Sequence, residues 1–148
     1  MAWTAPRTWV TSEVVTAAIL NTHIRDNLLE IAPGSTPWPI IFSSGDVALT
    51  VSTGTGRLKF PFAATLVSAT ATCGVAPTGA NVIVDVNRNS TSMFSTKPVI
   101  VATNQDGVKQ AASVTAIVSG DVLTVDVDQI GSTLPGENLT VILEITIP

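Results

Sequence analysis

Two hydrophobic patterns divide the chain. In residues 11–31, TSEVVTAAILNTHIRDNLLEI, apolar side chains recur at positions 20, 24, 28 and 31, a spacing that places them on one face of a helix. From residue 40 onward, apolar and polar residues alternate with a period of two, which is typical of strands with one buried face. A Pro/Gly-rich stretch, APGSTPWP, separates the patterns and excludes helix. We therefore predict an N-terminal arm, helix and linker at residues 1–39 and a β-body at residues 40–148.

The predicted helix is short and needs a partner. Thr16 is the expected N-cap, and Thr11 is an alternative one turn earlier. About fifteen residues are marginal as an isolated helix, so the apolar stripe must be covered. It packs either on the chain's own β-body or, as we favour, on sister subunits or a larger assembly. Exposed indoles are costly, so Trp3 and Trp9 are expected to anchor the terminus and Trp38 to plug the junction. The predicted interface residues are Trp3, Trp9, Leu20, Ile24, Leu28, Ile31 and Trp38.

The β-body shows many short strand patterns. Alternating runs occur at residues 47–51, 57–62, 67–73, 82–87, 114–118, 123–127 and 139–147, with weaker ones at 40–43, 92–95 and 99–102. Turn-forming clusters separate them, and Gly120-Asp121 between two runs predicts a two-residue hairpin. No second helical pattern is present to connect parallel strands. These features predict a mainly β fold with eight to ten strands, an antiparallel β-sandwich that is jelly-roll-like and follows one short helix.

Composition points to an assembly rather than a typical monomer. The 148 residues suffice for one domain with a small appendage. Hydrophobic residues make up 45% and charged residues only 12%, about half of the roughly 25% usual in soluble proteins. The mean hydropathy is +0.45, but no apolar run approaches the roughly 18 residues that a membrane span needs, so no membrane insertion is expected. With so few charges, either Thr, Ser and Asn solvate the surface or much of it is buried against other copies, and we favour a mixture of the two in a stable oligomer.

The charge pattern and the single cysteine limit partners and compartment. The net charge is -4, and the seven basic residues are scattered rather than gathered in the stripe that nucleic-acid binding requires. Cys73 alternates with alanines and is expected to be a small core residue, with no intrachain disulfide possible. The N-terminus has no secretory signal pattern, so we expect synthesis in the host cytoplasm.

The sequence contains no convincing catalytic constellation. His23 lies on the predicted helix, with no nucleophile positioned beside it, and no phosphate- or dinucleotide-binding motif is present. Asp85, Asp126 and Asp128 can hold a calcium ion if their strands are neighbours. The interpretation we favour for them is a solvated acidic face, or pairing with Arg88 or Lys97. We therefore expect no enzyme activity, no metal and no cofactor.

The N-terminal segment carries a family resemblance. Residues 8–27, TWVTSEVVTAAILNTHIRDN, resemble the opening of many tailed-bacteriophage structural proteins, typically TWV-T-x-E-x-V-T-A-A-x-L-N-T-H-I/V-R-D-N. Ile19 stands where the family often has a polar residue, and it broadens the apolar face of this helix. Residues 73–98 and 119–133 are similar to β-sandwich segments of phage tail-fibre and minor tail proteins. The resemblance implies a non-enzymatic virion protein, anchored by its helix with the sandwich projecting, as a tail-fibre or minor tail component.

The resemblance also implies partners and leaves alternatives open. It suggests a homotrimer that is located in the virion and contacts other proteins of the tail or capsid. One alternative is a capsid decoration or head-fibre protein, and another is a module that binds a host receptor or surface glycan. The candidate binding loops are residues 88–91, 104–107 and 131–138. A third alternative is a self-assembling filament subunit, in which residues 139–147 form an open edge strand.

Overall fold

The computed structural model describes residues 8, 11–12, 14, 16–21 and 38–147. The chain divides into two compact units, Met1–Thr36 and Pro37–Pro148. In the first unit, α1 spans Ala17–Leu20. The backbone N–H of Ile19 donates to the Thr16 hydroxyl at 3.3 Å, which confirms Thr16 as the N-cap. The predicted continuation of the helix through residues 22–31 lies outside the described residues.

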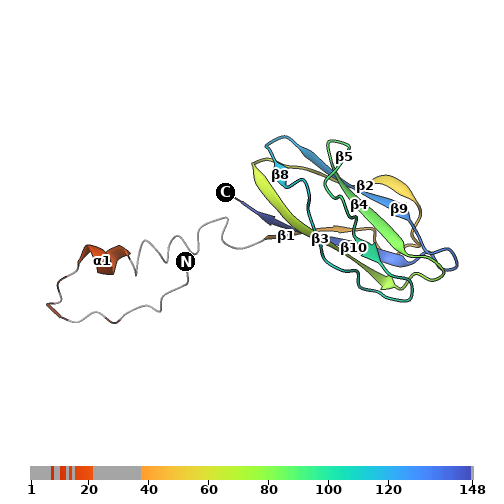
Figure 1. The fold of residues 1–148 in the computed structure, drawn as a ribbon, viewed down its shortest axis with the longest axis horizontal. Coiled ribbons are helices and arrows are strands. Elements are labelled where there is room, and N and C mark those ends of the chain that lie inside the picture. The colour runs from red at the N-terminus through yellow and green to blue at the C-terminus, as the bar shows by residue number, and fades with distance from the viewer. Residues whose placement is uncertain (1–7, 9–10, 13, 15, 22–37, 148) are drawn as a thin grey trace. The chain divides into compact units, whose positions relative to one another are not determined.

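The second unit consists of two antiparallel sheets, and the prediction of a mainly β antiparallel sandwich after a short helix is confirmed (Figure 1). In order across the first sheet, the strands are β1 (Trp38–Ser43), β10 (Glu137–Thr146) and β3 (Ala64–Val75), with β7 (Gln110–Ala111) and β8 (Ala116–Ile117) both pairing with β3. In order across the second sheet, they are β2 (Ser52–Lys59), β9 (Val122–Gln129) and β4 (Val82–Arg88), with β5 (Thr91–Ser92) and β6 (Val99–Ile100) both pairing with β4.

The first four strands lie alternately in the two sheets, so most connections cross between sheets. Within each sheet, the hydrogen-bonded strand pairs therefore join segments that are distant in sequence, such as β10 with β3 and β2 with β9. A tight local hairpin joins β4 to β5, where Asn89 and Ser90 have φ values of 49° and 68°. Positive φ at both turn residues matches the right-handed twist of the flanking strands.

The core lies between the sheets and follows the period-two pattern. In β10 every second residue from Leu139 to Ile145 is buried, because successive side chains of a strand point to opposite faces. The largest fully buried side chains come from both sheets and from the segments that connect them: Phe60, Leu66, Met93, Ile100, Ile117, Leu123, Leu143, Val82, Val84, Val86, Val127 and Val141. Cys73 is also buried, which confirms its prediction as a core residue.

One irregularity in β3 reverses the predicted orientation of Val67. The register between β10 and β3 shifts at Glu144/Ile145, so Ser68 opposes Glu144 whereas Leu66 opposes Ile145. Val67 is the extra residue, and it is 38% exposed. Because a bulge changes which side chains face inward, Leu66 enters the core in place of Val67. The alternation alone did not reveal the bulge.

The strand predicted at residues 47–51 is wrong. Ala48 forms only an isolated bridge with Glu137, and β2 begins at Ser52. Leu49 is buried, whereas Val47 and Val51 are exposed. The segment alternates in sequence, but one buried side chain is all that it contributes to the core.

The hairpin predicted at Gly120-Asp121 is also wrong. The turn exists, since Asp121 N–H donates to the Val118 carbonyl at 3.1 Å and Gly120 has a φ of 95°. However, β8 pairs with β3 in one sheet and β9 pairs with β2 and β4 in the other. The turn therefore carries the chain from one sheet to the other. A period-two pattern reports the buried face of a strand and not its neighbour, so both connections have the same sequence signature.

The run at residues 139–147 is not an open edge. β10 pairs along its length with β1 on one side and β3 on the other. Its backbone groups are therefore used inside the sheet, and the edge-strand argument for a filament subunit is wrong. Among the described strands, the edges are formed by β1 and by β7 and β8 in the first sheet, and by β2 and by β5 and β6 in the second. Pro39 in β1 removes one backbone donor from its edge.

The sandwich has two distinct ends. We call the end that holds Trp38, where the N-terminal unit is joined, the arm end. The last residues of β10 and the first of β3 lie there too, because Trp38 opposes Ile145 and Ile145 opposes Leu66. We call the opposite end the far end. Its connections are residues 44–51, 76–81, 101–109 and 130–136.

We predict that Leu143→Ala lowers the free energy of unfolding by about 3–5 kcal/mol, because it leaves a cavity at a fully buried position of a strand that lies between two neighbours. Urea denaturation of the full chain followed by circular dichroism measures the change. Ile142→Ala on the outer face of the same strand is the matched control and should cost only about 1 kcal/mol. Equal losses in the two variants would contradict the position of the core.

Candidate functional site

The predicted interface residues fall on both units. Leu20 ends α1 and is 42% exposed, so part of its apolar surface is accessible. Trp38 is 56% exposed. It begins β1, where it opposes Ile145, and it therefore belongs to a strand rather than to the linker that the sequence predicted. The other predicted members of the set lie outside the described residues, as does His23; these members are Trp3, Trp9, Ile24, Leu28 and Ile31.

Three carboxylates meet on the outer face of the second sheet. Asp85 of β4 directly opposes Asp126 of β9, and Asp128 lies two residues further along. Lys97 reaches this face from the segment between β5 and β6, with its Nζ 2.9 Å from Asp85 and 2.6 Å from Asp128. The hydrogen bonds to Asp128 and Asp85 raise the pKa of Lys97 above its usual range. The pairing with Lys97 is confirmed, and an ammonium group lies where a calcium ion was considered.

Asp126 has a structural role in the same sheet. Its carboxylate accepts a hydrogen bond from Gly54 N–H at 2.6 Å and another from the Asn87 carboxamide at 2.8 Å. Gly54 belongs to the stretch of β2 where the pairing with β9 is irregular. Asp126 therefore fixes that stretch against β9. Within residues 38–147 and the described part of the arm, no group of three or more His, Cys, Asp or Glu is placed to hold a metal ion.

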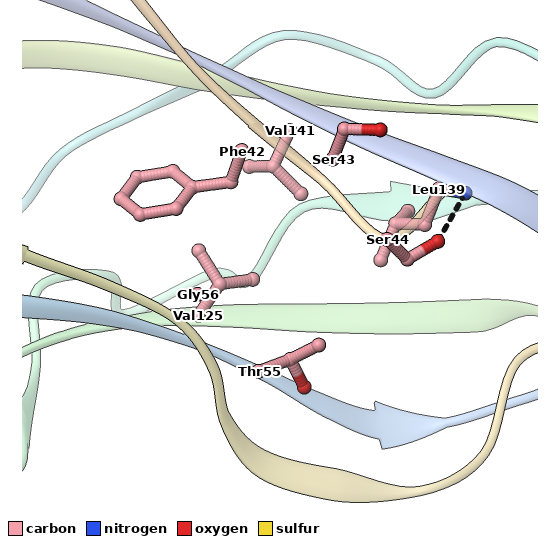
Figure 2. A pocket seen from close by; sticks show the side chains of 8 residues that line it. All are labelled: Phe42, Ser43, Ser44, Thr55, Gly56, Val125, Leu139 and Val141. Carbon is pink, nitrogen blue, oxygen red and sulfur yellow. Dashed lines mark hydrogen bonds between the residues drawn. The ribbon is translucent and has the colours of Figure 1, made fainter.

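A narrow crevice lies between the edges of the two sheets, and Figure 2 shows Phe42, Val141, Ser44 and Leu139 on one side of it, opposite Gly56, Val125 and Thr55. Its volume of about 20 Å³ is room for about one water molecule. A Cβ at Gly56 would lie 2.3 Å from the Phe42 ring, so the ring requires glycine there. Leu139 N–H donates to the Ser44 hydroxyl at 3.0 Å along the lining. Phe42, which packs against the core, borders the crevice, and the space left in it is too small for a ligand larger than about one water molecule.

Two polar side chains of loop 88–91, those of Arg88 and Asn89, bond to other parts of the fold. The Asp121 carboxylate accepts from Val118 N–H at 2.9 Å and from the Asn89 carboxamide at 2.6 Å. Asn89 in turn accepts from Val122 N–H at 3.0 Å. The Arg88 guanidinium donates to the Ala116 carbonyl and lies 3.9 Å from Asp121. These bonds stabilise the arm end and leave neither the Asn89 carboxamide nor the Asp121 carboxylate free of protein partners.

The loop at residues 131–138 is similarly occupied. The Asn138 carboxamide donates to Asp46 at 2.6 Å. Leu134 N–H donates to the Thr78 hydroxyl at 3.1 Å, and the same two residues form an isolated bridge. The loop is therefore a brace between connections of the far end.

The third candidate loop is built differently. Thr103, Asn104, Gln105 and Asp106 line an open hollow of about 520 Å³ together with Ala76 from the β3–β4 connection. Within the described residues, neither Asn104 nor Asp106 makes a side-chain hydrogen bond or ion pair. The sequence identified residues 104–107, but it missed Ala76 and Thr103. Ala76 is 27 or more positions away from these residues and has no chemical signal of its own, so only the fold brings it to this loop.

The buried thiol of Cys73 is disfavoured as a reactive site. Desolvation raises the pKa of the Cys73 thiol to about 11, so the reactive thiolate is scarce at neutral pH.

In the described part of the chain, no helix has the length and apolar character needed to cross a membrane.

Comparisons with known proteins yield a remote structural likeness. The sequence matches no protein-family model and no curated protein. Among solved structures, a chain of the cyanophage Pam1 capsid asymmetric unit is similar, with 14% sequence identity and a TM-score of 0.47. The alignment covers 97% of this chain and 99% of that chain.

We predict that Lys97→Met lowers the free energy of unfolding by roughly 1–3 kcal/mol, because it leaves the buried Asp85 carboxylate without its cation. Chemical denaturation at neutral pH measures the loss. Lys59→Met, at an exposed position of β2, is the control and should change stability by less than about 0.5 kcal/mol. An equal effect of the two substitutions would show that the ion pairs of Lys97 contribute nothing.

Asp121 is expected to make stability depend on pH. The Val118 N–H and the Asn89 carboxamide hold the pKa of Asp121 below its ordinary value of 3.8. The folded state thus binds this proton less tightly than the unfolded state, so ionised Asp121 stabilises the fold above about pH 4 and this contribution is lost as the pH falls through the lowered pKa. Between about pH 5 and about pH 2.5, the wild type should lose more unfolding free energy than Asp121→Asn. Parallel losses in urea titrations would contradict this assignment.

Proposed function

We propose that the chain is a non-enzymatic structural protein of a tailed-bacteriophage virion, attached through its N-terminal unit with the β-sandwich projecting. The observation that carries the proposal is the match of residues 8–27 to the opening segment of phage structural proteins, which extends over nearly every position. The similarity of residues 73–98 and 119–133 to tail-fibre and minor tail segments favours the tail. The proposal does not depend on the cyanophage capsid chain.

The form of the body supports a structural role. If β5 and β6 count as one interrupted strand and β7 and β8 as another, each sheet has four strands, in the orders β1-β10-β3-β7/β8 and β2-β9-β4-β5/β6. We interpret this arrangement as a jelly roll, in which two Greek keys wrap around one core. Such a body is rigid, and its carboxylates at positions 85, 121, 126 and 128 are bonded to other groups of the chain.

The N-terminal unit supplies the proposed means of attachment. Leu20 presents an apolar side chain that is partly exposed, and Thr16 sets the start of the helix that carries it. We propose that three copies pair the stripe of Leu20, Ile24 and Leu28, which buries it in a homotrimer and presents the assembly to neighbouring virion proteins. The low charge content of the sequence agrees with burial against other chains.

Leu20→Asp tests the attachment. We expect the variant to keep the thermal unfolding transition of the body, to lose the native mass of a trimer, and to be absent from purified particles, because a carboxylate in the stripe opposes its burial. Native mass spectrometry and immunogold microscopy of particles provide the readouts, and the gold position distinguishes tail from capsid. Val14→Asp, at an exposed position that precedes the helix, is the matched control and should be incorporated normally. Normal incorporation of Leu20→Asp would refute docking through the helix.

A further inference from the structure

We propose that the hollow at the far end binds a neutral sugar residue of a surface glycan, through Thr103, Asn104 and Asp106. Its lining also includes Ala76 and Gln105. The inference rests on the proposed function only for the biological surface involved, because it concerns a different part of the chain from the attachment helix.

The chemistry of the lining selects the class of ligand. A carboxamide, a carboxylate and a hydroxyl together offer both donors and acceptors, which is what the hydroxyl groups of a sugar require. The lining contains no Lys or Arg, so nothing in it compensates the charge of a phosphate or an acidic sugar. It contains no aromatic or large apolar side chain, which disfavours an apolar ligand. A calcium ion takes six to eight oxygen ligands, and the single carboxylate of the lining supplies far fewer.

The backbone of the loop is fixed before any ligand arrives. Thr103 N–H donates to the Pro77 carbonyl at 2.7 Å, and Cys73 N–H donates to the Gln105 carbonyl at 2.8 Å. At the end of the loop, Gly107 N–H donates to the Ala71 carbonyl at 2.9 Å. These bonds extend the edge of β3 along the loop. A ligand therefore need not bear the entropic cost of ordering this backbone.

Gly107 shows how closely the loop is held. A Cβ at this position would lie 2.6 Å from the Val99 carbonyl oxygen and 2.7 Å from that of Ala71. Real Cβ atoms do not approach backbone oxygens this closely, so only glycine permits the approach. At the other end of the loop, Thr103 has a φ of 74°, a left-handed conformation that is unfavourable for a β-branched residue. The contacts of the loop with β3 and with the β3–β4 connection therefore hold a conformation that the sequence does not favour locally.

Two side chains of this loop, those of Asn104 and Asp106, form no hydrogen bond or ion pair with other described residues. The Gln105 carboxamide donates to the Gly74 carbonyl and is committed. Lys109, the nearest cation along the chain, is paired with Glu144 at 2.5 Å. Asn104 and Asp106 have no such partner among the described residues. Elsewhere, Asn89 and Asn138 are bonded inside the fold, so the combination of a rigid backbone with free polar side chains occurs at loop 103–106.

The position of the hollow suits recognition. The N-terminal unit is joined at Trp38, at the arm end, whereas loop 103–106 lies at the far end beside the end of β3. The hollow therefore lies at the opposite end of the sandwich from the point at which the chain enters it.

Titration of the full-length ¹⁵N-labelled protein with individual sugars tests the inference. The probes are methyl α-D-glucopyranoside, methyl α-D-mannopyranoside, methyl β-D-galactopyranoside and N-acetylglucosamine, with N-acetylneuraminic acid and Ca²⁺ as charged comparisons. We expect at least one neutral sugar to shift the amide signals of residues 76 and 103–106 saturably, with a Kd of about 1–10 mM, which is typical for a ligand of this size. Asn104→Ala and Asp106→Asn should each weaken binding about five- to tenfold.

Glu137→Gln is the matched control, because it removes one exposed carboxylate at the same end but outside the hollow. It should leave the affinity unchanged. The absence of shifts with all four neutral sugars, shifts located elsewhere, or a response to Ca²⁺ or N-acetylneuraminic acid alone would each overturn the proposal. The measurement uses purified protein, so failure here leaves the Leu20→Asp incorporation result intact, and failure of incorporation leaves sugar binding intact.

Discussion

The shared apolar layer between the two sheets is the constraint on which the rest of this structure depends. Because the first four strands lie alternately in the two sheets, neither sheet is complete until distant segments have joined it. β10 is central to this arrangement, since it pairs with both β1 and β3 and buries alternate side chains from Leu139 to Ile145. The turn residues of the one tight local hairpin described above, Asn89 and Ser90, are exposed and lie outside this layer. Packing between distant segments therefore holds the body together.

The polar side chains divide into two groups with different uses. On the outer face of the second sheet and at the arm end, carboxylates are satisfied by lysine, amide and backbone donors of the same chain. These bonds hold edges and turns in place. At the far end, the backbone of loop 103–106 is bonded to β3 while Asn104 and Asp106 remain free of partners within the described residues. The groups that hold edges and turns are thus different from the two side chains that this loop leaves without partners.

The division of the chain into two units agrees with a division of labour. The N-terminal unit carries the segment that resembles phage structural proteins, and the sandwich carries the rigid body and its loops. The chain enters the sandwich at the arm end, where Trp38 begins β1, and loop 103–106 lies at the far end. A function assigned to the helix and a function assigned to the loops can therefore be tested by separate substitutions.

The sequence by itself determined the fold class, the N-cap at Thr16 and the buried position of Cys73. Hydrophobic periodicity, capping chemistry and residue size are local properties, and they act within a few residues. The sequence also identified the acidic face and its alternative pairing with Lys97, because charges of opposite sign were available for it.

Only the tertiary structure decided which strands are neighbours. It placed residues 139–147 inside a sheet, carried the Gly120-Asp121 turn between sheets, and turned Val67 outward at a bulge. It also brought Ala76 beside loop 103–106 and left Asn104 and Asp106 without partners among the described residues. The physical reason is that period-two alternation specifies the buried face of a strand, whereas its partner, register and loop environment depend on how all the segments share one core.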